Sequence, residues 1–381
     1  MVILSLLELY DLVSGFFYAS FFFVLFLFIS RLLTSTFSKH EKINLSILVI
    51  IIVFSFINIT INNISSSGFI SFQYYKKFIM FSSTLIYFFI ITKIKPTKRF
   101  VNFVLSSSVL LALVLMYYTF FQNLPRIADS LTLNFSNPNA AAVYLFAINI
   151  YVYLSFVKIK KLLIKTALLA LYFLMSYAIF DTNSRAVFIA IIVFFFMAIF
   201  LKSKKPFNRV FIILIILIPI IFVGIYTLMY KRNIIIDLEL FGKDFYSVRI
   251  KMWEQLLNLV SKKPVTGIYY EIGGPRGLSQ LHNIYIDTIC SYGYPVFVLL
   301  IVYLYRIYTN VNKFIETTIQ KISFIAILSF IIWGTGEAAL FTGFLGLYIF
   351  AGTLLIFVKH PPYQTLKMKP EDSRSAKIIN N

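Results

Sequence analysis

The chain has 381 residues, of which 60% are hydrophobic, 18% aromatic and 13% charged, and its formal net charge is +20. A soluble domain cannot bury so much apolar surface, so the composition excludes a water-soluble protein and predicts a polytopic membrane protein. The positive charge does not indicate nucleic-acid binding, because the basic residues form short clusters between apolar runs rather than one basic face.

Apolar runs recur along the whole chain. A membrane-spanning helix needs roughly 20 mostly apolar residues. We expect an all-α polytopic membrane protein with about eleven transmembrane helices, at residues 12–31, 43–61, 78–94, 100–121, 139–157, 162–180, 186–201, 209–230, 284–306, 322–338 and 341–358. Residues 1–358 then form one transmembrane domain, and residues 359–381 form a polar, basic tail near anionic lipid.

The connections between these runs differ in positive charge. Most Lys and Arg residues fall in one alternating set of connections, around 31–42, 93–99, 158–165, 202–209, 306–321 and 359–377. Connections rich in Lys and Arg stay in the cytoplasm. This pattern predicts the N-terminus outside, the C-terminus inside, and the long segment 231–283 as an extracytoplasmic loop.

The long loop has internal organisation. In the stretch "DFYSVRIKMWEQLLNLVSKKP", the apolar residues Ile250, Trp253, Leu257 and Val260 follow helical spacing, and Pro264 ends the pattern. We expect an amphipathic helix whose apolar face lies on the outer leaflet. The Gly-rich stretch "GIYYEIGGPRGLSQ" then leads back to the membrane.

His282 and Asn283 stand where the long loop meets an apolar run, in "LHNIYIDTICSYGYP". A helix N-terminus disfavours imidazolium, and a neutral imidazole can accept a proton from an attacking hydroxyl. His282 is therefore a candidate general base. The alternative is a polar helix cap that anchors the helix to headgroups.

Three arginines lie on the predicted outer side. Arg185, in the short link "FDTNSRAVF", and Arg249, at the start of the amphipathic helix, are candidate phosphate ligands, because a guanidinium binds phosphate oxygens bidentately. Snorkelling to lipid headgroups explains both equally well. Arg276, in the Gly-rich stretch, fits a solvated charge better than a ligand.

Further polar candidates open or close apolar runs. Asn137 and Asn139 flank Pro138 in "NFSNPNAAAVYLF", where they make a turn and helix cap or line a polar sugar site. Three readings are open for Glu337 in "WGTGEAALFTG": it pairs with an arginine, it serves as a second acid or base, or its role is structural.

Several motifs are missing from the sequence. There is no Walker-type phosphate loop, no zinc-ligand spacing and no serine-nucleophile motif, so we expect neither a metal nor a cofactor. The single cysteine, Cys290, rules out a disulfide framework. No series of acidic residues crosses the apolar runs, which argues against an ion-coupled pump.

Taken together, an Asn-Pro-Asn helix start, "TNSRA", "SVRIKMWEQLLNLVSKKPVTG" and "HNIYIDTICSYGYP" resemble the O-antigen polymerase and ligase superfamily over roughly residues 130 to 345. The chain departs from the family's Gly-x-Gly after the proline, because "PVTGIYY" has one glycine, which puts the shape of that turn in doubt.

The resemblance implies a metal-independent glycosyltransferase in the bacterial cytoplasmic membrane that uses polyprenyl-pyrophosphate-linked oligosaccharides. Arg185 and Arg249 would bind the pyrophosphate, and His282 would orient or deprotonate the acceptor hydroxyl. Asn137, Asn139, Asn283, Arg276 and Glu337 are the candidate substrate-binding residues. A flippase and a chain-length regulator are the implied protein partners.

Three functions fit this reading. The first is a polymerase that joins repeat units into capsule, exopolysaccharide or O-antigen, and it is the one we favour. The second is a ligase that moves finished glycan to lipid or protein. The third, from a different class, is a flippase or transporter of lipid-linked sugars, which would distribute polar residues through the spans and show pseudo-symmetric halves.

Overall fold

The structure is a computed structural model. It describes residues 14–34, 36–67, 72–94, 96–121, 126–127, 130–133, 138–201, 205–234, 249–268, 281–336 and 345–359. These ranges are almost entirely helical. The helices are α2 (Ser14–Thr34), α3 (Lys39–Ser67), α4 (Phe72–Ile91), α5 (Lys98–Phe121), α6 (Pro138–Lys158), α7 (Leu162–Asp181), α8 (Arg185–Phe200), α9 (Arg209–Lys231), α10 (Arg249–Val260), α12 (Ile284–Asn312), α13 (Thr318–Trp333) and α15 (Leu345–Lys359). Within the same ranges, two short antiparallel strands, β1 (Arg126–Ile127) and β2 (Ser130–Leu131), form one hairpin.

Each apolar run predicted from the sequence overlaps one of these helices. By length and composition, six described helices can cross a membrane, at residues 39–64, 98–121, 138–158, 162–181, 209–231 and 284–312. Four further apolar helices are shorter, at residues 24–34, 77–91, 185–200 and 318–333. The helical class is therefore confirmed, whereas the count of eleven crossings stays a prediction. The tail after Lys359 lies outside the described residues.

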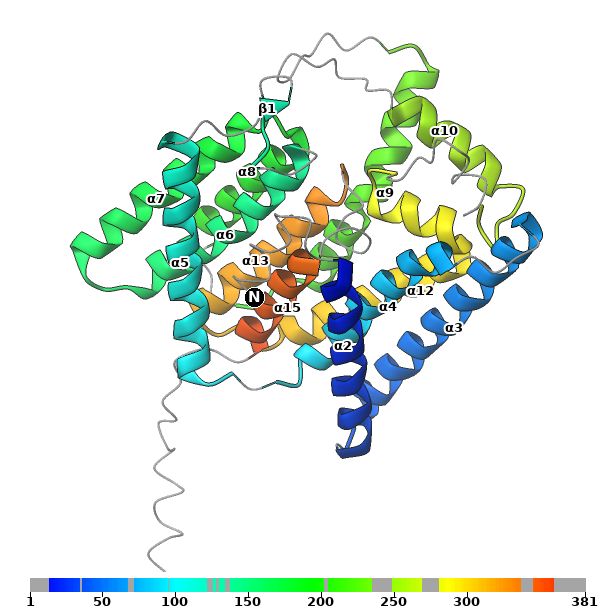
Figure 1. Ribbon diagram of the computed structural model, residues 1–381, viewed down its shortest axis with the longest axis horizontal. Helices are drawn as coiled ribbons and strands as arrows, with labels where there is room; N and C mark the ends of the chain where they lie inside the picture. The colour runs from blue at the N-terminus through cyan, green and yellow to red at the C-terminus, as the bar shows by residue number, and fades with distance from the viewer. Residues whose placement is uncertain are drawn as a thin grey trace, which may run out of the picture.

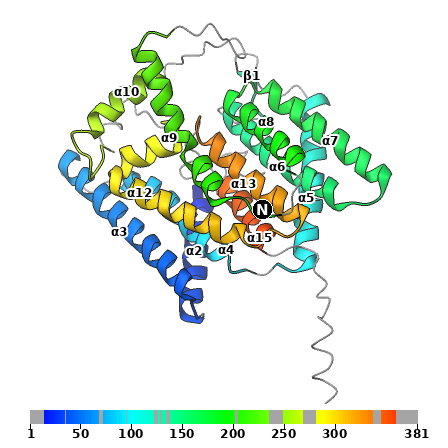
Figure 2. The ribbon, with the colours of Figure 1, turned by 180° about the vertical axis from the view of Figure 1, so that it is seen from behind.

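The helices form two groups on either side of a central pair, α13 and α15. Helices α5, α6, α7 and α8 pack together on one side, and α2, α3, α4 and α12 pack on the other (Figures 1 and 2). Between the groups, α13 contacts α6, α8, α9 and α15, while α15 also contacts α4. Helix α10 lies against α9 and α12 at one end of the molecule (Figure 1).

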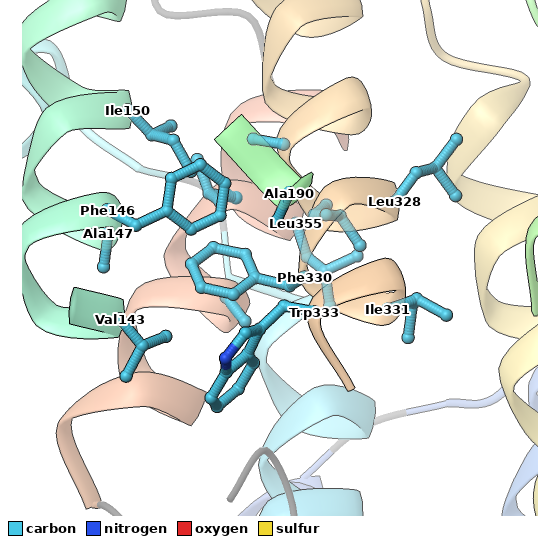
Figure 3. Close-up of a cluster of buried hydrophobic side chains, with 14 of the residues drawn as sticks. Val143, Phe146, Ala147, Ile150, Ala190, Leu328, Phe330, Ile331, Trp333 and Leu355 are labelled. Carbon is cyan, nitrogen blue, oxygen red and sulfur yellow. The ribbon is translucent and has the colours of Figure 1, made fainter. Parts of the chain in front are cut away.

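The core lies where α6 meets α13. Phe146 and Phe330 have ring centroids 5.2 Å apart, and Trp333 packs below them in the view of Figure 3, beside Val143. Nearly all of α6 is buried, which explains why this helix is apolar on every side. By contrast, Phe103 of α5 and Leu163 of α7 are 70% and 83% exposed. Such apolar surface belongs in a bilayer rather than in water.

Polar contacts between helix ends join connections of the same predicted side. Lys158 donates to Asn102 at 2.6 Å, and Arg306 donates to Asn44 at 2.7 Å. Lys93 pairs with Glu41. The basic connections assigned to the cytoplasm therefore contact one another. This grouping is the one that alternating crossings would produce.

Candidate active site

Three consecutive backbone carbonyls, in the turn Gly334–Gly336 that follows α13, organise the site. The Gly334 carbonyl accepts from the backbone N–H of Ile284 at 3.0 Å, and the Thr335 carbonyl accepts from Asn283 Nδ2 at 3.1 Å. The Gly336 carbonyl accepts from Arg249 Nη1 at 2.7 Å. Carbonyls at a helix C-terminus lack intrahelical partners, so they can hold other elements in place. This turn therefore joins the N-termini of α10 and α12.

Arg249 is the first residue of α10 and is half-buried. The helix is fixed at a second point, because Trp253 Nε1 donates to the Leu281 carbonyl at 2.8 Å. The sequence led us to expect that the apolar face of α10 lies on lipid, and this expectation is wrong. Ile250, Trp253 and Val260 are instead buried against α9 and α12. Arg249 is thus held by protein contacts at the site rather than by a surface helix.

Arg185 is the first residue of α8 and is also half-buried. The neighbouring Ala186 packs on Gly336 so closely that a Cβ added to this glycine would lie 2.6 Å from the Ala186 Cβ and 4.0 Å from Arg249 Nη1. The first turn of α8 and the Arg249 side chain therefore meet at one glycine. The two arginines, which are distant in sequence, start helices that converge on the same turn.

Asn283, not His282, caps α12. Its Oδ1 accepts from the backbone N–H groups of Tyr285 and Ile286 at 2.9 and 3.0 Å, and its side chain is fully buried. The reading of His282 as a helix cap is therefore wrong. His282 precedes the cap in a left-handed conformation with φ of 50° and is half-buried. Non-glycine residues rarely adopt this conformation, and such residues concentrate at functional sites.

The N-terminus of α12 lies beside the middle of α9 rather than beside its end. Asn283 Nδ2 donates to the carbonyl of Pro219 at 3.2 Å, and the Tyr285 hydroxyl donates to the carbonyl of Ile216 at 2.6 Å. Both acceptors lie well inside α9. The site is therefore recessed along α9, and α10 packs against the same two helices.

Asn139 lies in the first turn of α6 and is half-buried. Val143, one turn later on the same helix face, lies next to Trp333 (Figure 3). The neighbours Phe146–Phe330 and Val143–Trp333 follow opposite directions along the two helices, so α6 runs antiparallel to α13 here, and the start of α6 lies toward the C-terminal end of α13. The candidates Asn137, Arg276 and Glu337 lie outside the described residues.

Buried polar atoms without hydrogen-bond partners also occur here, within the described part of the chain. They are Ser184 Oγ, Trp333 Nε1 and Thr335 Oγ1. Ser184 precedes Arg185 and does not cap α8 with its side chain, and Thr335 precedes Gly336. A buried polar atom without a partner is costly, so these atoms are available to a polar ligand.

Two features of the site were missed at the level of sequence. The first is the Gly334–Gly336 turn, whose only signal was the "GTG" beside Glu337. The second is the buried Asp287 in the first turn of α12, which pairs with Lys77 of α4. Within the described ranges, no three His, Cys, Asp or Glu side chains gather as metal ligands. The site is built instead from arginines, amides and hydroxyls.

The fold and the candidate site together define a class of protein. The helical architecture, the exposed apolar surfaces and the recessed cationic site belong to a multi-pass membrane protein. A family model described as O-antigen ligase matches residues 170–301, which confirms the resemblance to the O-antigen polymerase and ligase superfamily over that segment. Members of that family are glycosyltransferase-like enzymes that act on lipid-linked glycans in membranes. No curated protein matches the sequence.

Proposed function

We propose that the protein is a polysaccharide polymerase that joins polyprenyl-pyrophosphate-linked repeat units at the outer face of the bacterial cytoplasmic membrane. The observation that carries the proposal is the meeting of three helix N-termini, those of α8, α10 and α12, at the Gly334–Gly336 turn. Helix N-termini attract anions. Two of these helices begin with an arginine, which adds full positive charges at the same place.

In the proposed reaction, an acceptor hydroxyl attacks the anomeric carbon of the donor glycan. A new C–O bond forms, the bond from that carbon to the pyrophosphate oxygen breaks, and polyprenyl pyrophosphate leaves with the electron pair. Arg185 and Arg249 bind the pyrophosphate and stabilise the negative charge that develops on it. The hydroxyls of Ser184 and Thr335, which are buried and have no hydrogen-bond partner in the described part of the chain, would donate to its oxygens.

His282 accepts the proton of the acceptor hydroxyl in this scheme. Three observations support this role over a structural one. The helix cap is Asn283, His282 is half-buried, and its backbone is held in a rare left-handed conformation. Trp253 of α10 donates to the carbonyl of Leu281, the residue that precedes His282. Helix α10 therefore positions both Arg249 and the backbone next to His282.

The decisive experiment reconstitutes the purified protein with polyprenyl-pyrophosphate-linked repeat units and separates the products on a gel. We expect a ladder of products from the wild type and at most traces of one from His282→Ala, Arg185→Ala or Arg249→Ala at equal folded protein and equal reaction time. Lys262→Ala is the matched control, because Lys262 is an exposed cation on the same loop. A ladder that survives His282→Ala would remove the histidine from the reaction.

The same assay separates the polymerase from the ligase. A single glycan transfer to an added lipid or protein acceptor, without a ladder, would replace our proposal with the ligase. Movement of lipid-linked sugar across sealed vesicles, without any glycan product, would replace it with a transporter.

The proposed orientation has its own test. Cys290 is the single cysteine of the chain and is fully buried, so background labelling by a membrane-impermeant maleimide should be low. Lys262→Cys should label from outside intact cells, whereas Arg99→Cys should label only after the membrane is opened. The reverse result would invert the topology and place the site on the cytoplasmic face.

A further inference from the structure

The loop after α10 fits into a kink of α12. Gly293 breaks α12 with φ of 82° and ψ of 172°. At the break, the Cys290 carbonyl accepts from the Ile268 N–H at 2.7 Å, and the Tyr294 N–H donates to the Pro264 carbonyl at 2.9 Å. In an unbroken helix, the Tyr294 N–H would donate to the Cys290 carbonyl. The Pro264–Ile268 loop therefore takes over the hydrogen bonds that the kink releases.

The fit leaves no room for larger residues. A Cβ on Gly267 would lie 2.5 Å from the Cys290 carbonyl oxygen, and a Cβ on Gly293 would lie 2.1 Å from the Val265 carbonyl oxygen. Gly267 also has a positive φ of 75°. One glycine after the proline therefore suffices for this turn, which answers the question raised by its departure from the Gly-x-Gly pattern.

Two asparagines of α3 hold the loop and the kink together. Asn58 Nδ2 donates to the Val265 carbonyl at 2.9 Å and to the Tyr292 carbonyl at 2.7 Å, so one amide joins the loop to α12. Asn62, one turn later, donates to the Thr266 carbonyl at 2.8 Å. Both side chains are buried. Helix α3 lies outside the matched segment 170–301.

We propose that Asn58, supported by Asn62, is a positioning residue for the transfer reaction, an inference that rests on the function proposed above. The loop continues directly from α10, so fixing it in the kink fixes the C-terminal end of α10 on α12. The contacts of Arg249 and Trp253 fix the other end. Asn58 thus acts on the catalytic geometry through α10, without touching the substrate.

The variant Asn58→Ala removes both hydrogen bonds. Because small misplacements of catalytic groups are costly, we expect kcat per folded enzyme to fall by about tenfold or more. The KM for the lipid-linked donor should change little, as happens when an interaction matters mainly in the transition state. Ser55→Ala is the matched control, since Ser55 lies one turn earlier in α3, is fully buried, and its Oγ has no hydrogen-bond partner in the described part of the chain.

A second readout does not depend on activity. Hydrogen–deuterium exchange should accelerate in Asn58→Ala at the amides of Ile268 and Tyr294, which close the loop into the kink, and should remain unchanged in Ser55→Ala. The thermal unfolding midpoint in detergent reports whether each variant is folded. If Asn58→Ala does not fold, Asn62→Ala, which loses one bond, should show smaller changes of the same kind.

The outcomes are distinct. Slower turnover together with faster exchange supports the positioning role. Unchanged kcat in a folded Asn58→Ala, or slower turnover with unchanged exchange, overturns it. If Asn62→Ala has to stand in, unchanged kcat in that variant overturns it equally. A wild type that makes no glycan product rejects the proposed function itself, and the positioning role with it.

Discussion

The guanidinium of Arg249 donates to the backbone carbonyl of Gly336 over 2.7 Å, joining positions 87 residues apart. This bond places the first residue of α10 at the end of α13, where Ala186 of α8 also packs. One side chain thus ties together the helices that carry both candidate arginines. The same side chain brings a full positive charge to this turn.

Substitution of Arg249 should affect catalysis more than folding. Arg249→Ala removes a charged donor from the site, and we expect a loss of about 100-fold in kcat/KM for the lipid-linked donor. Arg249→Lys keeps the charge but not the planar fork, so it should restore only part of the activity. Steady-state rates with the purified protein test this. Equal rates for Arg249→Ala and wild type would make the Gly336 contact purely structural.

Asn283 should matter for stability. Asn283→Ala removes the cap of α12 and the donor to two backbone carbonyls, for a combined cost of about 2–4 kcal/mol. The matched control is Asn208→Ala, which removes the exposed cap of α9, at about 1 kcal/mol. Unfolding midpoints in detergent give the comparison. Similar shifts for both variants would mean that the buried Nδ2 contacts contribute little.

The kink of α12 should require glycine. Gly293→Ala places a Cβ against the Val265 carbonyl at a positive φ, and we expect it to destabilise the protein by at least about 2 kcal/mol. Gly224→Ala serves as control, because a Cβ there meets nothing within 4 Å. Alanine is the better helix former, so this control should be neutral or slightly stabilising. A Gly293→Ala protein that unfolds like wild type would show that the loop can move aside.

The Lys77–Asp287 pair is suited to a double-mutant cycle. Lys77→Met leaves the buried Asp287 carboxylate without this partner and should cost about 3–5 kcal/mol, whereas Lys77→Met combined with Asp287→Asn should recover most of that loss. The more exposed Arg126–Asp181 pair is the reference, and Arg126→Ala should cost about 1 kcal/mol or less. Additive losses at positions 77 and 287 would show that the pair is not coupled.

The sequence predicted the helical class and the approximate place of each apolar helix, because hydrophobic runs of this length have few other solutions. It also identified Arg185 and His282 as candidates from their place at the ends of those runs, and Arg249 from its place at the start of the amphipathic helix. The turn at Gly334–Gly336 could not be predicted in the same way. Backbone carbonyls carry no residue-specific signal, and their partners lie in other helices.

Residue identity alone also could not decide two further points. His282 was a possible cap, but the neighbouring Asn283 takes that place, because only its amide can cap α12 and donate to α9 and α13 together. Helix α10 has the spacing of a surface helix, yet its apolar face is covered by α9 and α12. Local periodicity shows which face is apolar and does not show whether lipid or protein covers it.

By itself, then, the sequence determined that this chain builds apolar helices with basic ends and places its polar candidates at helix starts. Only the tertiary structure decided which of those starts meet. Arg249 and Ala186 meet at Gly336 and Asn283 binds the adjacent Thr335 after α13, and Asn58 holds the loop that follows α10. The physical reason is that helix formation depends on nearby residues, whereas a site depends on contacts between segments that are distant in the chain.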